Sequence, residues 1–534
     1  MRTKAKLSQA VEEAFLYLSQ LPDIVEVEVF ASSNAQNVFR IDYKSHILCN
    51  GGEEAKSKED YGIGVQAIFK TADGIKIGFG SESNNLSLEG AKIALEKARE
   101  GAVPDNEFVS LPKTIELKRT LYDYHDPEML ELSEKDFIAA GWKILDGAIK
   151  EFLNSETLKK LALLKNKPVS SLGLIVGGDM TVVAESIAVA STSMPEIQTD
   201  ESTFVTVQIT AMVEKFDAKG SGYGSYAKLS KIDDKAGKEA AQNAIDACGV
   251  IINGEIQKPL SIASGTYPVI FGPQPVSELM SNLIIPSLGA DAFWGLQSPF
   301  TGQFGKQVVS SEINIFDDAA NPEYVGAKGI TCEGLPTKRT ELIKAGVLND
   351  ILSNWYETQR LLHKDPEAEK KLGKDPKELY RQGKLFPTSG FRFNRGGGRG
   401  YDATAGISGT NTVFEGTNPK NIKELVADVP FGIYIGRIWY CYPMNGLKAG
   451  DFTATVIADS FVIKDGKIMA PLKANAVRIN DNIMRVLNSV KAVSNGKKAS
   501  IIWAADEVPV ACDILVSNVT LEEIGAEEAP PTGV

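Results

Sequence analysis

The chain has 534 residues, of which 43% are apolar and 24% are charged, a composition ordinary for a soluble protein and a length too great for one compact core. We therefore expect two or three domains. The formal net charge of -12 argues against a nucleic-acid partner, because neutralising duplex phosphates needs clustered Lys and Arg.

The N-terminal segment and the spacing of the cysteines predict a reduced, cytoplasmic compartment. The N-terminal segment is interrupted by Glu12 and Glu13, which predicts an amphipathic helix rather than a signal peptide, and no uncharged apolar run reaches the roughly 18 residues of a membrane span. The cysteines are scattered without CxxC spacing, which favours neither a zinc knuckle nor a disulfide framework. They are Cys49, Cys248, Cys332, Cys441 and Cys512. We expect a soluble, cytoplasmic protein with no membrane partner.

Residues 1–105 are expected to form an N-terminal α+β module. The stretch VEVEVFASSNAQNVFRIDYKSHIL has two alternating runs around the polar SSNAQN, which is typical of a β-hairpin. YGIGVQAIFKTADGIKIGFG predicts a second pair of strands joined at TADG. SLEGAKIALEKAREGA then has helical spacing, with Ser87 as the expected N-terminal cap.

The rest of the chain divides into a middle module and a β-rich domain. Over residues 106–263, helical spacing from Ser133 to Leu164 and in DKAGKEAAQNAIDAC alternates with strand patterns, which predicts a second α+β module. From 264 to 534 strands dominate, as in GTYPVIF, QVVSSEINIFDD, GIYIGRIWYCYP, DFTATVIADSFVI and ASIIWAA. The predicted fold class is α+β, with a β-rich C-terminal domain.

A charged stretch at about 363–400 departs from both patterns. It carries three prolines and ends in RFNRGGGRG, which predicts a surface excursion with one short helix. The glycine tract lacks the GxxxxGK[ST] spacing of a phosphate-binding loop, so a mobile loop is the better interpretation.

Catalytic motifs are scarce in this sequence. His46, His125 and His363 lie in separate modules and form no HExxH pair, and no GxSxG elbow is present. Asp317 and Asp318 pair at a strand end, where turn capping is the common use and catalysis the alternative. Local motifs alone therefore assign no chemistry.

The order of several blocks resembles the TldD/PmbA family, also called TldD/TldE or "modulator of DNA gyrase" proteins. In the second half these are GTYPVIFGPQPVSELMSNL, QFGKQVVSSEINIFDD, GITCEGLPTKRTELIKAGVLNDIL, GTNTVFEGT and DFTATVIADSFVIKDGKIMAPLK. YGIGVQAIF, IGFGSESNNLSLEGAKIALEKA and KAGKEAAQNAIDA are similar to the family's first two modules. The resemblance extends from about residue 25 to 520, and EGLPTKR followed by KAGVL is its most specific part.

The resemblance implies a dimeric peptidase assembly. In the TldD branch, a helix bearing HExxxH and a later cysteine hold a metal, and the glutamate is available as general base. Here Ser277 stands in place of the first histidine, Glu278 matches the glutamate, and Asn282 replaces the second histidine. The cysteine position falls at about Ile501, with Cys512 further along the chain.

Neutral serine and asparagine oxygens are weak ligands for a zinc-like ion. We therefore expect no metal and no cofactor in this chain, a pattern similar to the PmbA/TldE branch, whose TldD-like partner carries the divalent metal. VSELMSNL would be the relic of a metal helix, with its polar side chains serving as helix caps and surface hydrogen bonds. Glu278 and Asn282 are spaced i and i+4, where contact is easy.

The resemblance also implies that an extended peptide pairs with strands of the C-terminal domain inside a closed dimer cavity. Carried over by motif, the candidate substrate contacts are Glu333, Gly334, Arg339, Thr410 and Asn411. A structural role is the alternative for each of them. Gly334 fits a turn, and Arg339 could pair with Glu333.

Three functions stay open at this point. The leading one is a metal-free TldE-like subunit that forms a heterodimer with a TldD-like metallopeptidase and encloses unfolded peptides for processing or degradation. The second is an autonomous metallopeptidase in which Glu278 and ligands outside the family pattern bind a divalent ion. The third is a noncatalytic homodimer that shelters extended peptides.

Overall fold

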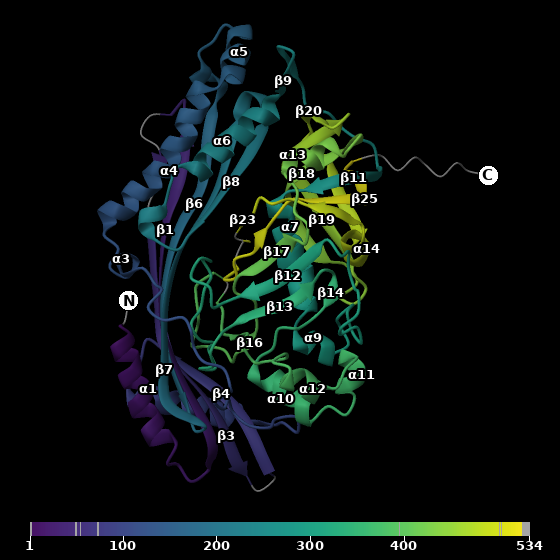
Figure 1. Cartoon of the computed structure of the whole chain (residues 1–534). Helices are drawn as coiled ribbons and strands as arrows, with labels where there is room; N and C mark the ends of the chain where they lie inside the picture. The colour runs from purple at the N-terminus through teal and green to yellow at the C-terminus, as the bar shows by residue number, and fades with distance from the viewer. Residues whose placement is uncertain are drawn as a thin grey trace, which may run out of the picture.

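The computed structural model describes residues 3–47, 51–53, 55–71, 74–394, 396–500, 502 and 505–525. A long sheet built by the N-terminal half lies along one side of the molecule, and the C-terminal domain lies against it (Figure 1). The α+β class with a β-rich C-terminal half is thus confirmed. Within the described ranges, no helix combines the length and the apolar character needed to cross a bilayer.

One antiparallel sheet unites the two predicted N-terminal modules. Its strands are β1 (Ile24–Lys44), β2 (Gly51–Gly52), β3 (Lys56–Thr71), β4 (Gly74–Ser83), β5 (Val103–Pro104), β6 (Leu174–Ser191), β7 (Met194–Val213) and β8 (Ala218–Tyr226). The order is β5-β4-β3-β1-β6-β7-β8, with β2 beside β1. The predicted boundary near residue 105 therefore does not separate two sheets, because β1 pairs along most of its length with β6.

The hairpin predicted around SSNAQN is wrong, because β1 is one continuous strand of 21 residues. The polar segment lies in mid-strand, where Ser33 is in register with Tyr61 on β3 and Ser186 on β6. Asn34 Nδ2 donates to the carbonyl oxygen of Arg399 at 2.9 Å. Asn34 thus bonds to a buried part of the C-terminal domain. The polar residues of this segment look like a turn in the sequence, but they serve this long-range contact. The second predicted pair, β3 with β4, is confirmed.

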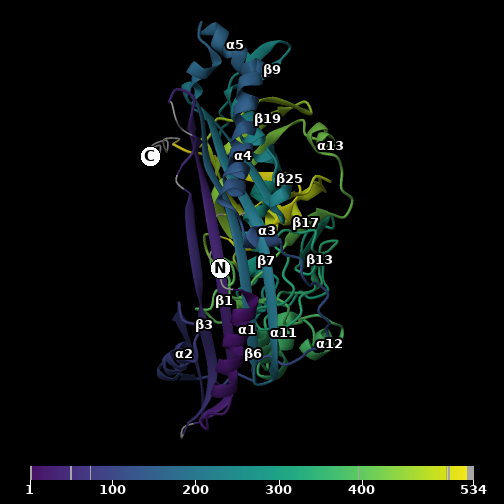
Figure 2. The ribbon, with the colours of Figure 1, turned by 90° about the vertical axis from the view of Figure 1, so that its left-hand side faces the viewer.

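Two apolar clusters cover the two ends of this sheet. Near one end pack α1 (Lys4–Leu18) and α2 (Leu88–Glu100), and near the other α4 (Glu134–Asn154), α5 (Glu156–Leu164) and α6 (Lys235–Cys248). Figure 2 shows α1 and α4 lying along the same long strands at opposite ends. The N-terminal half therefore has two cores on one sheet, and the second core includes Phe39 and Ile41 of β1.

Helix capping and glycine allow α2 and α6 to lie close to the strands. Ser87 Oγ accepts from Gly90 N at 3.3 Å, which confirms the predicted cap of α2. A Cβ at Gly78 would come within 1.8 Å of the Ala98 carbonyl oxygen, and one at Gly222 within 1.8 Å of that of Ala236. Each helix thus approaches its strand at a place where only glycine fits.

The C-terminal domain contains two larger sheets that share one hydrophobic core. The seven-stranded sheet has β11 (Gly265–Phe271), β18 (Phe431–Pro443), β19 (Asp451–Lys464), β20 (Lys467–Pro471), β21 (Val477–Asn482), β22 (Val490–Val493) and β25 (Ile514–Glu523). The six-stranded sheet has β12 (Ile313–Asp318), β13 (Arg339–Lys344), β14 (Val347–Leu348), β17 (Thr412–Gly416), β23 (Lys498–Ala499) and β24 (Val510–Ala511).

Short elements connect these layers. In the N-terminal half they are α3 (Pro127–Leu130), the 3₁₀ turns η1 (Val169–Leu172), η2 (Glu214–Phe216) and η3 (Leu229–Lys231), and the β9–β10 pair (Val250–Ile252, Glu255–Gln257). In the C-terminal domain they are α7 (Pro273–Leu279), the π turn η4 (Met280–Ile284), α8 (Ile285–Ser287), α9 (Ala290–Trp294), α10 (Trp355–His363), α11 (Ala368–Leu372), α12 (Pro376–Arg381), β15 (Gly390–Phe391), β16 (Gly406–Ile407), α13 (Ile422–Ala427) and α14 (Ile483–Asn488).

The stretch at about 363–400 is only in part the surface excursion predicted. It holds two short helices, α11 and α12, whose charged side chains are exposed except for Lys371 and whose Leu372 and Leu379 are buried. Its glycine-rich end enters the interior, since Arg392 and Arg399 are buried. A mobile surface loop is therefore the wrong interpretation of RFNRGGGRG. The charged, glycine-rich sequence of this segment suggested a surface loop. Sequence alone does not distinguish a buried arginine from an exposed one, because its acidic partners lie elsewhere in the chain. Arg395 lies outside the described residues.

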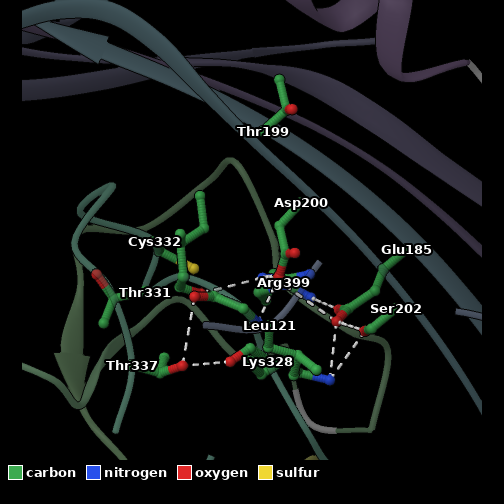
Figure 3. A network of polar contacts seen from close by, with 12 residues as sticks. Leu121, Glu185, Thr199, Asp200, Ser202, Lys328, Thr331, Cys332, Thr337 and Arg399 are labelled. Atoms are coloured by element: carbon green, nitrogen blue, oxygen red, sulfur yellow. Dashed lines mark hydrogen bonds and ion pairs between the residues drawn. The ribbon is translucent and has the colours of Figure 1, made fainter. Parts of the chain in front are cut away.

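A buried ion network fastens the C-terminal domain to β6 and β7 (Figure 3). Arg399 Nε lies 3.0 Å from Glu185 Oε1, and its Nη1 lies 2.8 Å from Asp200 Oδ2. Lys328 Nζ lies 2.9 Å from the same oxygen of Glu185 and donates to Ser202 Oγ at 3.0 Å. Two cationic side chains of the C-terminal domain thus form ion pairs with two carboxylates on the sheet.

Electrostatics keep this network ionised. Burial opposes the charged form of Glu185, but Arg399 and Lys328 outweigh it and lower the pKa of Glu185 to about 2. Asp200 receives further donors from the Nη2 of Arg119 at 2.7 Å and the hydroxyl of Tyr124 at 2.8 Å. Each carboxylate therefore has several charged or polar donors, which a buried pair needs to offset its desolvation.

Replacing Arg399 by methionine should lower the free energy of unfolding by about 3–5 kcal/mol, because two carboxylates lose a buried partner. The control is Arg40→Met, which breaks the exposed 3.1 Å pair with Asp179 and should cost under about 1 kcal/mol. Urea denaturation followed by circular dichroism measures both. Equal losses in the two variants would contradict the role assigned to Arg399.

Candidate functional site

The stretch VSELMSNL lies where an α-helix widens into a π turn. β11 leads through Gly272 into α7, and Pro273 occupies the first turn, where its missing N–H breaks no helical hydrogen bond. The helix continues as η4. Pro286 cannot donate to the carbonyl of Asn282, which favours the wider turn. The segment packs against β11, β18 and β24.

Glu278 is held by two amides at the centre of this segment. Its Oε1 accepts from Gln274 Nε2 at 3.0 Å, and its Oε2 accepts from Asn282 Nδ2 at 3.0 Å. Gln274 Oε1 in turn accepts from the backbone N–H of Ile438 at 3.0 Å. The carboxylate is therefore tied to strand β18, and the contact predicted between Glu278 and Asn282 is confirmed.

The surface role predicted for these polar side chains is wrong. Glu278 is 7% exposed and Ser277 is 0% exposed. Ser277 Oγ donates to the carbonyl oxygen of Pro273 at 2.8 Å, and the N-cap of α7 is Gly272, without a side-chain cap. Because strands surround the helix, its polar residues bond to one another and to its own backbone instead of to water.

The three side chains do not fit a transition-metal site. The hydroxyl of Ser277 donates a hydrogen bond to the carbonyl oxygen of Pro273. Asn282 presents its N–H groups toward Glu278, and an N–H group cannot ligate a cation. One carboxylate is left, whereas zinc takes three or four N, S or O donors. In the part of the chain that the structure describes, no three His, Cys, Asp or Glu side chains gather into a metal-binding group.

The cysteine position carried over by resemblance, about Ile501, lies outside the described residues. Cys512 directly follows β24 and is buried. Cys441 on β18 lies nearer the helix, and burial together with the Glu278 carboxylate raises the pKa of its thiol above the usual range. Both thiols are therefore protonated near pH 7 and poor metal ligands as they stand.

Glu278 is an unusual carboxyl group electrostatically. Burial raises its pKa to about 7, and hydrogen bonds from Asn282 and Gln274 and the charge of Arg437 oppose that rise. Arg437 itself reaches across to β8, where its Nη1 donates to Ser221 Oγ. The helix therefore retains a carboxyl group that can gain or lose a proton near neutral pH.

Among the candidate substrate residues, Glu333 is a buried carboxyl group that accepts from the backbone of Trp355. Both carboxylate oxygens accept from the backbone N–H of Trp355, at 3.1 and 3.0 Å. Burial, with the Glu28 charge nearby, raises its pKa to about 8, while the Trp355 N–H and Arg392 oppose the rise. The pairing considered between Arg339 and Glu333 is absent from the described contacts, because Arg339 Nε bonds to Glu341 Oε1 at 2.6 Å.

Gly334 is buried, whereas Arg339 is exposed. Gly334 has a φ of 78°, which confirms a turn position, and it packs beside Val189 of the sheet. The side chain of Arg339 is 43% exposed, with its guanidinium 3.4 Å from the centre of the Phe316 ring. Of the five candidates, Arg339 is the one whose charged group solvent or a peptide reaches freely.

Thr410 and Asn411 are committed to internal hydrogen bonds. Thr410 donates through its backbone N–H to Asp317 Oδ1 at 2.8 Å. Asn411 Oδ1 accepts from Gly326 N at 2.7 Å, and its Nδ2 donates to the Asp318 carbonyl oxygen at 3.0 Å. Both residues are buried, so these side chains brace the end of β12. Asp317 thus holds the bend that leads into β17.

Two cavities near these residues were not foreseen from the sequence. One, of about 580 Å³, is lined by Ser281 at the π turn and by Asp506 and Glu507. The other, of about 370 Å³, is lined by Glu333, Trp355 and Arg392 among others. Asp291 and Ile407 line both cavities, so the two are neighbours. The available signal in the sequence was Arg392 in RFNRGGGRG, the one residue of that segment that lines the smaller cavity.

Comparison with known proteins agrees with this architecture. Residues 264–523 match the model of the PmbA/TldA metallopeptidase C-terminal domain. An uncharacterized protein of Methanocaldococcus jannaschii is 25% identical over 415 residues, which cover 77% of this chain and 80% of that protein. A metalloprotease TldD homolog of Buchnera aphidicola is 26% identical over 44% of this chain and 42% of its own length, less than half of either protein.

The structure of TldE from Thermococcus kodakarensis matches 96% of this chain and 100% of that chain, with a TM-score of 0.71 and 17% identity. At that identity the likeness shows the fold alone. The fold and the matching domain together define a relative of metallopeptidases. The chain belongs to the TldD/PmbA family, as its sequence blocks predicted.

Replacing Glu278 by glutamine should change how stability depends on pH. The folded-state pKa of about 7 lies above the ordinary value of 4.5, so the stability that Glu278 itself contributes is fully present below pH 4.5 and is lost as pH rises to about 7. The glutamine does not titrate. Its melting temperature relative to wild type should therefore rise across this window, equivalent to roughly 1–3 kcal/mol. A pH-independent difference in differential scanning fluorimetry would contradict the buried environment of Glu278.

Replacing Asn411 by alanine should destabilise the fold by about 2–4 kcal/mol, because a buried N–H and a carbonyl lose their partners. Arg339→Ala should change stability by under about 1 kcal/mol, because its guanidinium is largely exposed and its short ion pair is the exposed one with Glu341. Urea unfolding of both variants checks the contrast. A neutral Asn411→Ala would mean that the side chain is free to serve a ligand.

Proposed function

We propose that this chain is a metal-free TldE-like subunit, which pairs with a TldD-like metallopeptidase in the cytoplasm and encloses unfolded peptides for processing or degradation. The proposal builds on membership of the family and on the residues at the metal helix. A zinc-like divalent metal then belongs to the partner, and this chain contributes walls and peptide contacts.

The observation that carries the proposal is the internal commitment of Ser277 and Asn282. Their polar atoms bond to Pro273 and Glu278 within one helix, and the segment packs among strands. Admitting a cation would require breaking these bonds and gathering further ligands around a single carboxylate. Such a helix is suited to support its neighbours rather than to hold a metal.

An autonomous metallopeptidase is the second candidate, and the protonation behaviour of Glu278 favours it. A carboxyl group with a pKa of about 7 matches the working range of a general base. A noncatalytic homodimer that shelters peptides is the third candidate. Native mass spectrometry separates it from the leading proposal, because its homodimer would persist when a TldD-like partner is added.

Metal analysis and peptide cleavage test the proposal together. The purified chain should carry far less than one zinc per chain by inductively coupled plasma mass spectrometry. It should cleave unfolded peptides only after a TldD-like partner is added, and a chelator should abolish that cleavage. About one zinc per chain, or chelator-sensitive cleavage by the chain alone that Glu278→Gln abolishes, would contradict the proposal and support the autonomous peptidase.

A further inference from the structure

The cavity of about 370 Å³ lies between the N-terminal sheet and the C-terminal domain. Glu28 on β1 and Gln66 on β3 contribute to its lining from the sheet, and Trp355 at the start of α10 and Gly406 on β16 from the domain. Phe108, in the segment that joins the two N-terminal modules, adds an aromatic wall. The cavity therefore exists only when the N-terminal sheet and the C-terminal domain are in contact. The helix of Glu278, in contrast, lies within the C-terminal domain.

Carboxylates dominate the charge of this cavity. Glu28 and Glu333 are buried, whereas Asp291 is exposed at the rim beside the exposed Gly406. Glu357 is the fourth, and its nearest cation, Arg360, also pairs with Glu107 at 2.9 Å. Arg392 is the cation that itself lines the cavity. Glu28 pairs with Arg392 and Glu357 with Arg360, so among the described residues Glu333 and Asp291 are left without an ion-pair partner, and an ammonium group beside them would favour the ionised form of Glu333.

Two buried groups lack full hydrogen bonding. Arg392 pairs with Glu28 through Nη2, but among the described residues its Nε and Nη1 have no hydrogen-bond partner. Glu333 receives one N–H, that of Trp355, shared between both of its oxygens. Unpaired donors and acceptors at this depth cost about 1–3 kcal/mol each, so a ligand that supplies both an acceptor and a donor would bind with a gain.

We propose that this cavity receives the free amino terminus of a peptide. The terminal ammonium lies beside Glu333 and donates to its carboxylate, and the first carbonyl oxygen accepts from Nε or Nη1 of Arg392. The first side chain packs on Phe108 and Trp355. This inference rests on the proposed function, because it assigns an end-recognition site to the peptides that the assembly would enclose.

The alternatives fit less well. A terminal carboxylate would place a further acidic group beside Glu333 and Asp291, whereas an ammonium supplies three donors that these two carboxylates can accept. A volume of about 370 Å³ accommodates one or two residues and not a folded surface. Since Asp291 and Ile407 also line the larger cavity beside Ser281, the peptide would continue from the rim toward the metal helix.

Peptide binding to the full-length chain tests the inference. Two flexible peptides that begin with leucine and differ only in acetylation of the amino terminus would be titrated by isothermal calorimetry. The free peptide should bind at least about tenfold more tightly, equivalent to about 1.4 kcal/mol. Glu333→Gln should bring the two affinities within about twofold of each other.

Two further variants keep the test independent of folding. Glu341→Gln makes the same substitution on β13, away from the cavity lining, and should leave the preference unchanged. Gly406→Leu adds bulk where a Cβ meets nothing within 4 Å, so it should reduce binding of the free peptide at least about tenfold with an unaltered melting temperature. Binding unaffected by Gly406→Leu would contradict this location.

Failure of this inference differs from failure of the proposed function. Equal affinity for the free and acetylated peptides, or equal competition by a simple alkylamine, would overturn recognition of the amino terminus. Partner-dependent cleavage would then still stand as evidence for the peptidase assembly. A zinc-bearing chain that nevertheless prefers free amino termini would overturn the metal-free assignment and leave this site in place.

Discussion

The insertion of Arg399 and Lys328 between Glu185 and Asp200 is the interaction on which the arrangement of the molecule depends. It joins the C-terminal domain to the middle of the long sheet, where β1 of the first module pairs with β6 of the second. Buried charges stabilise little by themselves, but they penalise every other placement strongly. The network therefore fixes the position of one half against the other, and with it the cavity that both halves line.

The same constraint explains why polar residues occur where a sequence pattern suggests loops. The SSNAQN segment remains in a strand because Asn34 donates to the Arg399 backbone. The backbone of residues 396–400 can pass close to the sheet because its glycines add no side chains, and the N–H groups of Gly396 and Gly398 donate to Asp506 at 2.7 and 2.8 Å. Both segments are shaped by contacts between residues more than 100 positions apart.

Local patterns therefore predicted the longer helices α1, α2, α4, α5 and α6 and most strands, whereas short helices such as α3, α9, α13 and α14 were not predicted. The spacing of α2 and α6 and the pairing of β3 with β4 follow from nearby residues, as do the strands of the β-rich half. The continuity of β1, the burial of Arg399 and the shared sheet depend on partners 100 or more residues away. At the site, the i, i+4 spacing indicated the contact between Glu278 and Asn282 that the structure shows. It could not reveal the cavity at Glu333, which needs both halves in place.

The central claim is that the helix of Glu278 is occupied by its own hydrogen bonds and holds no cation. Crystals of the chain with its TldD-like partner, grown with zinc and measured at the zinc absorption edge, test it directly. The account predicts an anomalous peak in the partner and none within bonding distance of Glu278. A peak beside the Glu278 carboxylate would contradict it.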